Sequence, residues 1–380
     1  MGVLVRNVLI GIVALAFIGL AIVFFLSAHA KDGLFAASSN SSLNIGVLAP
    51  LTGNYSIVGG NVRDGMELAK ENLLAKNSNQ RINLVFEDSC VAKDTISGFN
   101  KMTTVDNIDL LGASFCIIGF VPVIPMAEEK KIISFSVAAS PDSVLNKKYV
   151  FSLNKSIKSD ANDLAAYAVN KLGAKTAAIV FYNTALGSDY NKYLSESFTN
   201  LGADVLSTHL TEIDRTDYRT ELTLIKSENP DVIIAIELSQ YLGLLLKQSR
   251  ELGVSSKFLS QSTAEDPTVL SAAQGAAEGM IISTSEPKTI TPEIEAFKSA
   301  YAAKYNKNAN IMSAIAYDSL MLEVAALNKC NKEVECLRNE FSSIKNYSGA
   351  SGLITMGADG STYREPNFKI VKNGEFVQIE

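Results

Sequence analysis

The sequence predicts an α/β protein built from two lobes, each a parallel sheet covered by helices. Three observations lead to this prediction. Short apolar runs rich in Val and Ile alternate with helix-like segments, which is the pattern of strands buried on both faces of a parallel sheet. The alternation begins at Leu43 and restarts at about Lys175, with a similar length each time. The 380 residues, 47% of them hydrophobic, fit two domains better than one.

The first series of elements runs from Leu43 to about Phe151. Its apolar runs predict the strands Leu43–Leu48, Ile82–Phe86, Leu110–Leu111 and Ile132–Ser136. The segments between them predict the helices Val62–Leu74, Thr95–Asp106 and Val123–Glu129. Strand and helix therefore alternate, as in a parallel sheet with helices outside.

The second series runs from Lys175 to about Ser285. Its predicted strands are Ala177–Tyr182, Asp204–Leu210, Val232–Ile236 and Met280–Ser283. The helix-like runs around them are Ala161–Leu172, Leu194–Leu201, Tyr218–Ser227, Tyr241–Leu252 and Val269–Ala273. Because ligands of such sheets bind at the carboxyl ends of the strands, we expect a ligand cleft between the lobes.

The last part of the chain departs from this alternation. Helices Glu293–Tyr305 and Ile311–Leu327 follow each other directly, and the strand-like segments Leu353–Thr355 and Phe368–Val371 end the chain. Such late elements indicate that the chain crosses between the lobes after the second series, which predicts a hinged protein.

The N-terminus reads as an export segment. Arg6 precedes an apolar run from Val8 to Leu26, and Ala28-His29-Ala30 fits signal peptidase cleavage before Lys31. The run is also long enough to span a bilayer. Residues 1–30 are therefore either a cleaved signal peptide or a retained membrane anchor, and residues 31–42 are a polar linker. Both alternatives place the rest of the chain outside the cytoplasm.

Charge and histidine content exclude several functions. The net charge of −6 provides no basic field for nucleic acid. His29 lies in the N-terminal segment, which leaves only His209 in the folded part. Histidine-based metal sites and Ser/His/Asp triads are therefore not expected, and Gly-x-Ser-x-Gly is absent. We expect no metal, no cofactor and no enzymatic activity.

The four cysteines favour structural disulfides. An even number suits an oxidising compartment. Cys90 and Cys116 each lie near the end of a predicted strand, and Cys330 and Cys336 lie in the polar segment NKCNKEVEC. The spacing is not C-x-x-C, which argues against redox or zinc chemistry.

Two loops at predicted strand ends are candidates for ligand binding. The first, in IGVLAPLTGNYSIVGG, has no Gly-Lys-Ser/Thr and so does not predict a phosphate site. It is either a tight turn that caps a helix or a binding loop that offers Asn54, Ser56 and backbone N–H groups. The second, Ser136-Val-Ala-Ala-Ser140, is either an ordinary strand exit or a small-residue loop that presents a hydroxyl group.

Several segments, taken in order, resemble the leucine/isoleucine/valine-binding protein family of type I periplasmic binding proteins. They are IGVLAPLTGNYSIVGGNVRDGMELA, LVFEDSC, PMAEEKKIISFSVAAS, TAAIVFYNTALGSDY, AAEGMIIS, SAIAYDSLML, SGLITMGADGS and FKIVKNGEFV. Together they cover nearly all of Leu43–Glu380. The resemblance also implies a Cys90–Cys116 disulfide.

The resemblance implies two Rossmann-like lobes joined by a three-crossover hinge that closes on a ligand. Residues 43–157 with 288–350 form the first lobe, and residues 158–287 with 351–380 form the second. It further implies an extracytoplasmic solute-binding protein that delivers a small polar or amino-acid-like solute to the permease subunits of an ABC-type importer. The alternative is a ligand-sensing receptor of the same fold. The membrane is a partner only if the N-terminal segment stays uncleaved.

The resemblance also places the ligand contacts. Amino-acid binders of this family carry a hydroxyl residue after the second cysteine, whereas this chain has Ile117, followed by Ile118. Ala138 and Ser140 match the positions that hold the ligand ammonium through a backbone oxygen and the carboxylate through a hydroxyl group and an N–H group. Ala139 lies between them and is a further candidate.

Other family positions differ in this chain. The aromatic positions appear as Val58 and Leu186, with Leu238 as a further apolar residue. The acidic partner of the ligand ammonium falls at Ser262, and Glu237 and Glu265 are nearby charge partners that lie out of register. A zwitterion needs both charges paired in the cleft. We therefore expect a less charged or more apolar ligand than a typical α-amino acid, unless one of the two Glu residues supplies the missing charge.

Overall fold

The structure is a computed structural model that describes residues 42–379, without the side chain of Asn54. The predicted signal peptide or anchor and nearly all of the predicted linker lie outside the described residues. Residues 43–78 and 82–379 belong to one compact unit, which contains every helix and strand described below.

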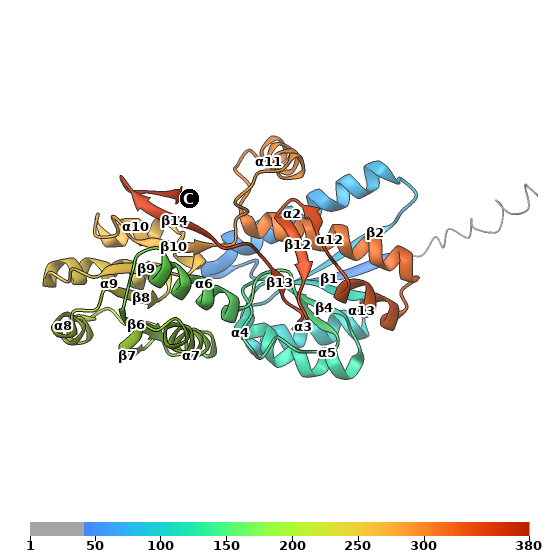
Figure 1. Ribbon diagram of the computed structural model, residues 1–380. Helices are drawn as coiled ribbons and strands as arrows, with labels where there is room; N and C mark the ends of the chain where they lie inside the picture. Colours follow the sequence, from blue (N-terminus) through green and yellow to red (C-terminus); the bar gives the residue numbers. More distant parts are fainter. Residues whose placement is uncertain (1–41, 380) are drawn as a thin grey trace, which may run out of the picture. The chain divides into compact units, whose positions relative to one another are not determined.

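The first lobe is built on a five-stranded parallel sheet in the order β2-β1-β3-β4-β5. Figure 1 labels β1, β2 and β4 of this sheet. Its strands are β1 (Leu43–Ala49), β2 (Ile82–Asp88), β3 (Leu110–Ser114), β4 (Ser134–Ser136) and β5 (Val150–Ser152). One face packs on α2 (Ser56–Lys76), α12 (Ile311–Cys330) and α13 (Val334–Ser342). The other packs on α3 (Ala92–Thr104), α4 (Ile117–Phe120) and α5 (Ile124–Lys130). Val47 faces the first group and Leu48 the second, which explains why β1 is apolar throughout.

The second lobe is built on a seven-stranded sheet in the order β15-β14-β10-β9-β8-β6-β7. Five strands are parallel: β6 (Thr176–Tyr182), β7 (Asp204–Thr211), β8 (Val232–Ile236), β9 (Lys257–Ser260) and β10 (Ile281–Thr284). The strands β14 (Asn367–Lys372) and β15 (Glu375–Ile379) add to one edge in the antiparallel sense. One face packs on α6 (Ile157–Asn170) and α7 (Ala185–Asn200), and the other on α8 (Arg219–Glu228), α9 (Ser239–Leu252) and α10 (Pro267–Ala273). The sequence therefore predicts the α/β class and the parallel sheets correctly.

The two lobes repeat one topology. The order β2-β1-β3-β4-β5 in the first lobe corresponds to β7-β6-β8-β9-β10 in the second. The order reverses between β1 and β3, and between β6 and β8. The carboxyl ends of strands at such switch points are where open α/β sheets bind ligands.

A glycine is required at the same place in both lobes. A Cβ atom at Gly59 in α2 would lie 1.8 Å from the Pro50 carbonyl oxygen, and one at Gly187 in α7 would lie 2.1 Å from the Tyr182 carbonyl oxygen. In each lobe, the helix that follows the first strand packs directly on the end of that strand. Only glycine allows this close approach.

The chain passes between the lobes three times, at residues 153–156, 285–291 and 364–366. Between the second and third passages lie α11 (Pro292–Tyr305), α12, α13 and the antiparallel strands β11 (Tyr347–Gly349), β12 (Gly352–Met356) and β13 (Thr362–Tyr363). The sequence assigns residues 351–380 to the second lobe, whereas Ile354 and Met356 pack in the core of the first. This happens because β12 pairs with β11 and β13 rather than with the second sheet.

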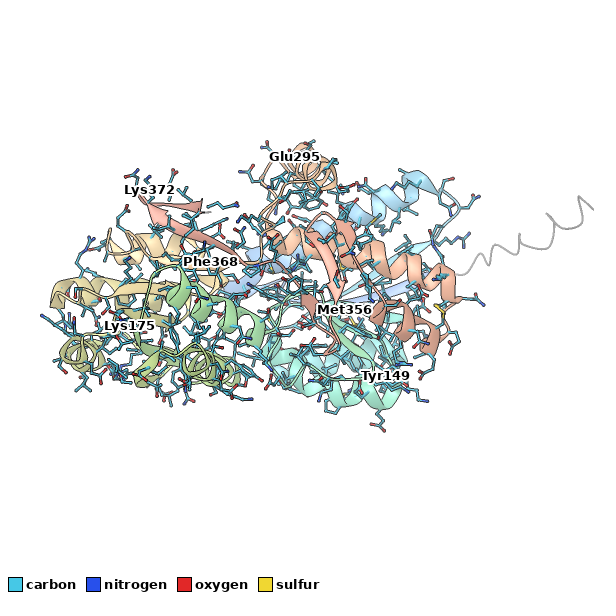
Figure 2. The ribbon with its side chains drawn as sticks, in the orientation of Figure 1. Tyr149, Lys175, Glu295, Met356, Phe368 and Lys372 are labelled. Carbon is cyan, nitrogen blue, oxygen red and sulfur yellow. A yellow bond between two sulfur atoms is a disulfide. The ribbon has the colours of Figure 1, made fainter. Side chains whose placement is uncertain are left out.

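The returning strand β14 is fastened to the second lobe by an aromatic contact. The ring of Phe368, which is labelled in Figure 2, packs on Tyr167 of α6 with 4.2 Å between the ring centres. Phe368 also belongs to the core between the sheet and α6/α7.

Helix α12 is the core helix of the first lobe. Among the described residues, it is the helix that is long and apolar enough to cross a membrane, with a mean hydropathy of 1.2. Its residues Ile315, Leu320 and Val324 are buried in the first core, so its composition is accounted for by packing.

Both disulfides favoured by the sequence are present. Cys90–Cys116 joins the segment after β2 to the residue before α4, and Cys330–Cys336 joins the end of α12 to α13.

Candidate functional site

The predicted ligand residues of the first lobe lie after β1, β3 and β4. Asn54 lies in a short 3₁₀ helix, η1 (Gly53–Tyr55), and its side chain is outside the described atoms. Ser56 and Val58 are half-buried residues in the first turn of α2. Ile117 and Ile118 open α4, and Ile118 is 69% exposed. Since β1 and β3 are neighbours, these two groups share one edge of the sheet.

The small-residue loop after β4 is hydrogen-bonded to the first crossover. Ala138 and Ala139 are half-buried, and Ser140 is fully buried. The Ser140 hydroxyl lies 2.8 Å from Ser152 Oγ and 3.3 Å from the Ala138 carbonyl oxygen, and its N–H donates to Lys155 O over 3.4 Å. A solute that bonds to Ser140 therefore competes with the crossover.

The predicted residues of the second lobe lie after β6, β8 and β9. Leu186 is half-buried in the first turn of α7, where Thr184 Oγ1 accepts a 3.1 Å bond from Gly187 N. Leu238 is the half-buried N-cap of α9. Ser262 opens a further 3₁₀ helix, η3 (Ser262–Ala264), and is also half-buried.

The two candidate charge partners differ in their surroundings. Glu265 forms an ion pair with Lys369, which also binds Glu286 with 2.8 Å between Nζ and Oε2. Glu237 is 1% exposed, and its carboxyl group contacts the hydroxyl groups of Thr211 and Tyr218. Burial raises the pKa of both Glu residues, that of Glu237 to about 7. Glu265 thus already has a cationic partner.

Two tyrosines that the sequence analysis does not single out lie at the same strand ends. Tyr182 ends β6, and burial raises its pKa, while hydrogen bonds with Thr184 and Gln261 act in the opposite direction. Tyr55 of the first loop is 48% exposed and close enough to influence the pKa of Tyr182. Tyr182 could have been chosen from the sequence as a candidate ligand residue, because it bears a hydroxyl group and ends an apolar strand.

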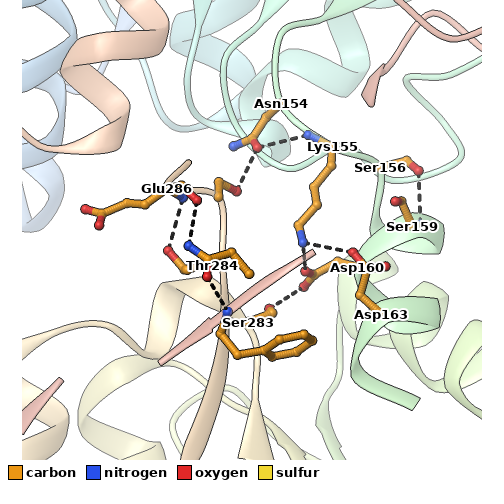
Figure 3. Close-up of polar contacts among 12 residues, drawn as sticks. Asn154, Lys155, Ser156, Ser159, Asp160, Asp163, Ser283, Thr284 and Glu286 are labelled. Carbon is orange, nitrogen blue, oxygen red and sulfur yellow. Dashed lines mark hydrogen bonds and ion pairs between the residues drawn. The ribbon is translucent and has the colours of Figure 1, made fainter. Parts of the chain in front are cut away.

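A buried ionic cluster lies at the first crossover (Figure 3). Lys155 Nζ lies 2.7 Å from Asp160 Oδ1 and 3.2 Å from Asp163 Oδ2. Asp160 Oδ2 accepts hydrogen bonds from Tyr190 of α7 over 2.7 Å and from Ser283 of β10 over 3.0 Å. Burial raises the pKa of Asp163 to about 6. The cluster connects the crossover to three elements of the second lobe.

Hydrogen bonds join the three crossovers to one another. Asn154 Oδ1 accepts a 2.9 Å bond from Ser285 Oγ, which links the first crossover to the second (Figure 3). Arg364 donates to Leu153 O over 2.8 Å and to Ser351 O over 2.7 Å, which links the third to the first. The connections between the lobes therefore form one hydrogen-bonded group.

This arrangement fits reversible binding. The strand ends present hydroxyl, amide and backbone groups beside apolar side chains, which can hold a small solute without covalent chemistry. Residues 42–379 contain no group of three or more His, Cys, Asp or Glu side chains placed to hold a metal ion.

Comparisons with known proteins identify the family. A family profile described as "Periplasmic binding protein" matches residues 42–371. A Leu/Ile/Val-binding protein from Rhizobium johnstonii is 25% identical over 340 residues, which cover 86% of this chain and 90% of that protein. A Leu/Ile/Val-binding protein from Citrobacter freundii is 22% identical over 298 residues, covering 77% of this chain and 81% of that protein.

Solved structures agree with the two-lobed fold. A leucine-binding protein from Thermotoga maritima superposes with a TM-score of 0.80 at 22% identity, covering 89% of this chain and 98% of that one. A solute-binding protein of an ABC transporter from R. palustris, solved with benzoate, gives a TM-score of 0.76 at 18% identity, covering 89% and 96%. These relatives are solute-binding proteins rather than enzymes. The chain belongs to the periplasmic binding protein family, which implies an extracytoplasmic location.

Proposed function

We propose that this protein captures a small solute between its lobes, outside the cytoplasm, and delivers it to the permease subunits of an ABC-type importer. One observation carries the proposal. The expected ligand residues of both lobes follow strands at or beside equivalent topological switch points, in a chain of this family. Closure of the lobes on the solute would give the permease a shape to recognise.

The solute is less charged or more apolar than a typical α-amino acid. Val58, Ile117, Leu186 and Leu238 support this part of the proposal, since each offers an apolar side chain at a strand end. The ion pair of Glu265 with Lys369 supports it further, because that carboxylate is already neutralised. The R. palustris protein solved with benzoate provides a precedent in this fold for a ligand without an ammonium group.

A thermal-shift screen of amino acids, amides and small carboxylates tests the proposed function. A ligand that binds only the folded state raises the melting temperature. A matched pair of probes tests the solute class: leucine and 4-methylpentanoate, which has the carbon skeleton of leucine without the amino group. We expect the deaminated acid to give the larger shift, confirmed by isothermal titration. Micromolar binding of leucine with no response to the acid would contradict the solute class but leave the binding function in place. No response to any small solute would contradict the binding function itself.

A further inference from the structure

We propose that each lobe contains a buried carboxyl group that keeps its proton in the folded protein in mildly acidic solution. These groups are Glu323 in α12 of the first lobe and Glu237 after β8 of the second. Each one donates its hydrogen to a hydroxyl group, and that hydroxyl group donates in turn to a strand carbonyl oxygen.

In the first lobe, the proton on Glu323 follows from the number of hydrogens that Ser319 can donate. The Ser319 hydroxyl lies 2.6 Å from the Gly112 carbonyl oxygen and also within hydrogen-bond distance of Glu323 Oε1. A serine hydroxyl has a single hydrogen, so it donates to only one of these two oxygens. The second contact needs a hydrogen from Glu323.

The position of Gly112 decides which oxygen receives the serine hydrogen. Strand β1 pairs Gly46 with Leu111 and Val47 with Ala113, so that Gly112 is skipped in a bulge. A buried carbonyl group outside the ladder needs another donor, and Ser319 is in place to supply it. Ser319 therefore donates to Gly112 O, and Glu323 donates to Ser319.

The surroundings of Glu323 disfavour its ionised form. The side chain is fully buried, and Oε2 has no hydrogen-bond partner among the described residues. A Cβ atom at position 112 would lie 2.4 Å from Oε2, so the carboxyl group occupies the space that a glycine leaves. An unpaired buried charge is far more costly than a neutral acid. In agreement, burial raises the pKa of Glu323 to about 8, and Ser319 is the one group that acts against it.

Glu237 has a related arrangement in the second lobe, although the strand residue there, Phe181, is paired with both neighbouring strands. Thr211 Oγ1 lies 3.2 Å from the Phe181 carbonyl oxygen and within hydrogen-bond distance of Glu237 Oε1. The same count of one hydrogen applies to the threonine hydroxyl. Tyr218 donates to the other carboxyl oxygen, Oε2, over 3.4 Å. When Glu237 is protonated, each of the contacts among Glu237, Thr211, Tyr218 and the Phe181 carbonyl oxygen has one hydrogen to share.

The titratable and charged groups that face Glu237 come from two parts of the chain. They are Tyr182 at the end of β6, and Arg215 and Tyr218 in the segment between β7 and α8. Arg215 favours the ionised form, but it forms its ion pair with Glu221. Burial is the larger influence and raises the pKa of Glu237 to about 7.

These two protons make folding dependent on pH in a defined direction. Both folded-state pKa values lie above the ordinary value of 4.5. The resulting stabilisation is complete below pH 4.5 and is lost as the pH rises through about 7 and about 8. Glu129, which is exposed, provides the position for a control substitution.

Carbon-13 NMR of the intact protein with labelled glutamate carboxyl groups tests the inference directly. The signals are assigned from the variants Glu323→Gln and Glu237→Gln. At pH 6 we expect both assigned signals at the chemical shift of a neutral acid. Either signal at the carboxylate shift at pH 6 would overturn the inference for that lobe.

Melting temperatures between pH 4.5 and 8.5 supply the second readout. The Gln side chain keeps the donor to the hydroxyl group and has no proton to lose. We expect wild type to lose several degrees relative to Glu323→Gln as the pH rises, and Glu129→Gln to follow the wild-type curve. Parallel curves for wild type and Glu323→Gln would contradict the inference. If Glu323→Gln does not fold, Ser319→Ala identifies the Glu323 signal instead, because it removes the one hydrogen-bond partner of that acid.

Discussion

Lys155 Nζ lies 2.7 Å from Asp160 Oδ1, and both side chains are 2% exposed. Lys155 belongs to the first crossover, and Asp160 lies in the first turn of α6 in the second lobe. The ion pair fixes the start of that lobe to the chain segment that leaves the first.

Removal of the Lys155 charge should destabilise the protein strongly. Lys155→Met leaves Asp160 buried without its cation, and we expect a loss of about 3–5 kcal/mol in the free energy of unfolding. Lys158→Met, three residues away on the exposed surface, is the control and should change the free energy by less than about 0.5 kcal/mol. Urea denaturation measures both values. A loss at Lys155 no larger than at Lys158 would mean that the pair adds nothing to stability.

Gly59 and Gly60 are neighbours in α2, and we expect their substitution by Ala to change stability in opposite directions. The Cβ of Gly59→Ala would overlap the Pro50 carbonyl group, so we expect a loss of about 2 kcal/mol or more. Its neighbour Gly60 has open space around the Cβ position, so Gly60→Ala should stabilise α2 by about 0.5–1 kcal/mol. Opposite signs in denaturant unfolding confirm the prediction, and equal effects contradict it.

The two disulfides should contribute unequally. Cys90–Cys116 closes a separation of 26 residues and Cys330–Cys336 one of 6. In the chain-entropy account, the double Ala variants lose about 3.5 and about 2.2 kcal/mol respectively. Calorimetry of the two variants gives the order, and a larger loss from the shorter loop would show that loop entropy does not govern these bonds.

The hydroxyl group of Ser140 should matter for binding if the proposed function is correct. A hydrogen bond to a carboxylate is worth about 1.5–3 kcal/mol, so Ser140→Ala should weaken binding of a carboxylate solute about tenfold or more. The exposed Ser143, three residues further on, provides the matched control Ser143→Ala. Isothermal titration compares the dissociation constants, and equal affinities for the two variants would remove Ser140 from the site.

Strands and helices with an uninterrupted apolar pattern could be predicted from the sequence. Val232–Ile236 is apolar at every position and forms a strand with the predicted limits. The strand Lys257–Ser260 was not predicted, because polar residues interrupt its pattern. Pairing with its neighbouring strands rather than local sequence determines this element.

Two helices begin earlier than predicted for the same physical reason. The sequences SIVGG and ALGSD look like loops because they contain glycine, yet α2 begins at Ser56 and α7 at Ala185. The glycines are needed for contact with the preceding strand and not for a turn. A single sequence cannot show this difference.

The candidate loops could be located from the sequence, whereas the bonds within and around them could not. Strand ends are visible in the sequence, so the loops around Ser56, Ile117 and Ser140 could be found. The partner of Glu265 is Lys369, which lies 104 residues away, and only the fold brings them together. The same is true of Asp160 and Ser283, which are 123 residues apart.

The hydrogen bonds among the three crossovers limit how the lobes can move. Asn154 holds Ser285, and Arg364 holds Leu153, so the three connections cannot slide past one another without breaking these bonds. We therefore expect the lobes to rotate about one axis when they open and close. One pair of fluorescent labels, one on each lobe, would then report this motion as a single distance.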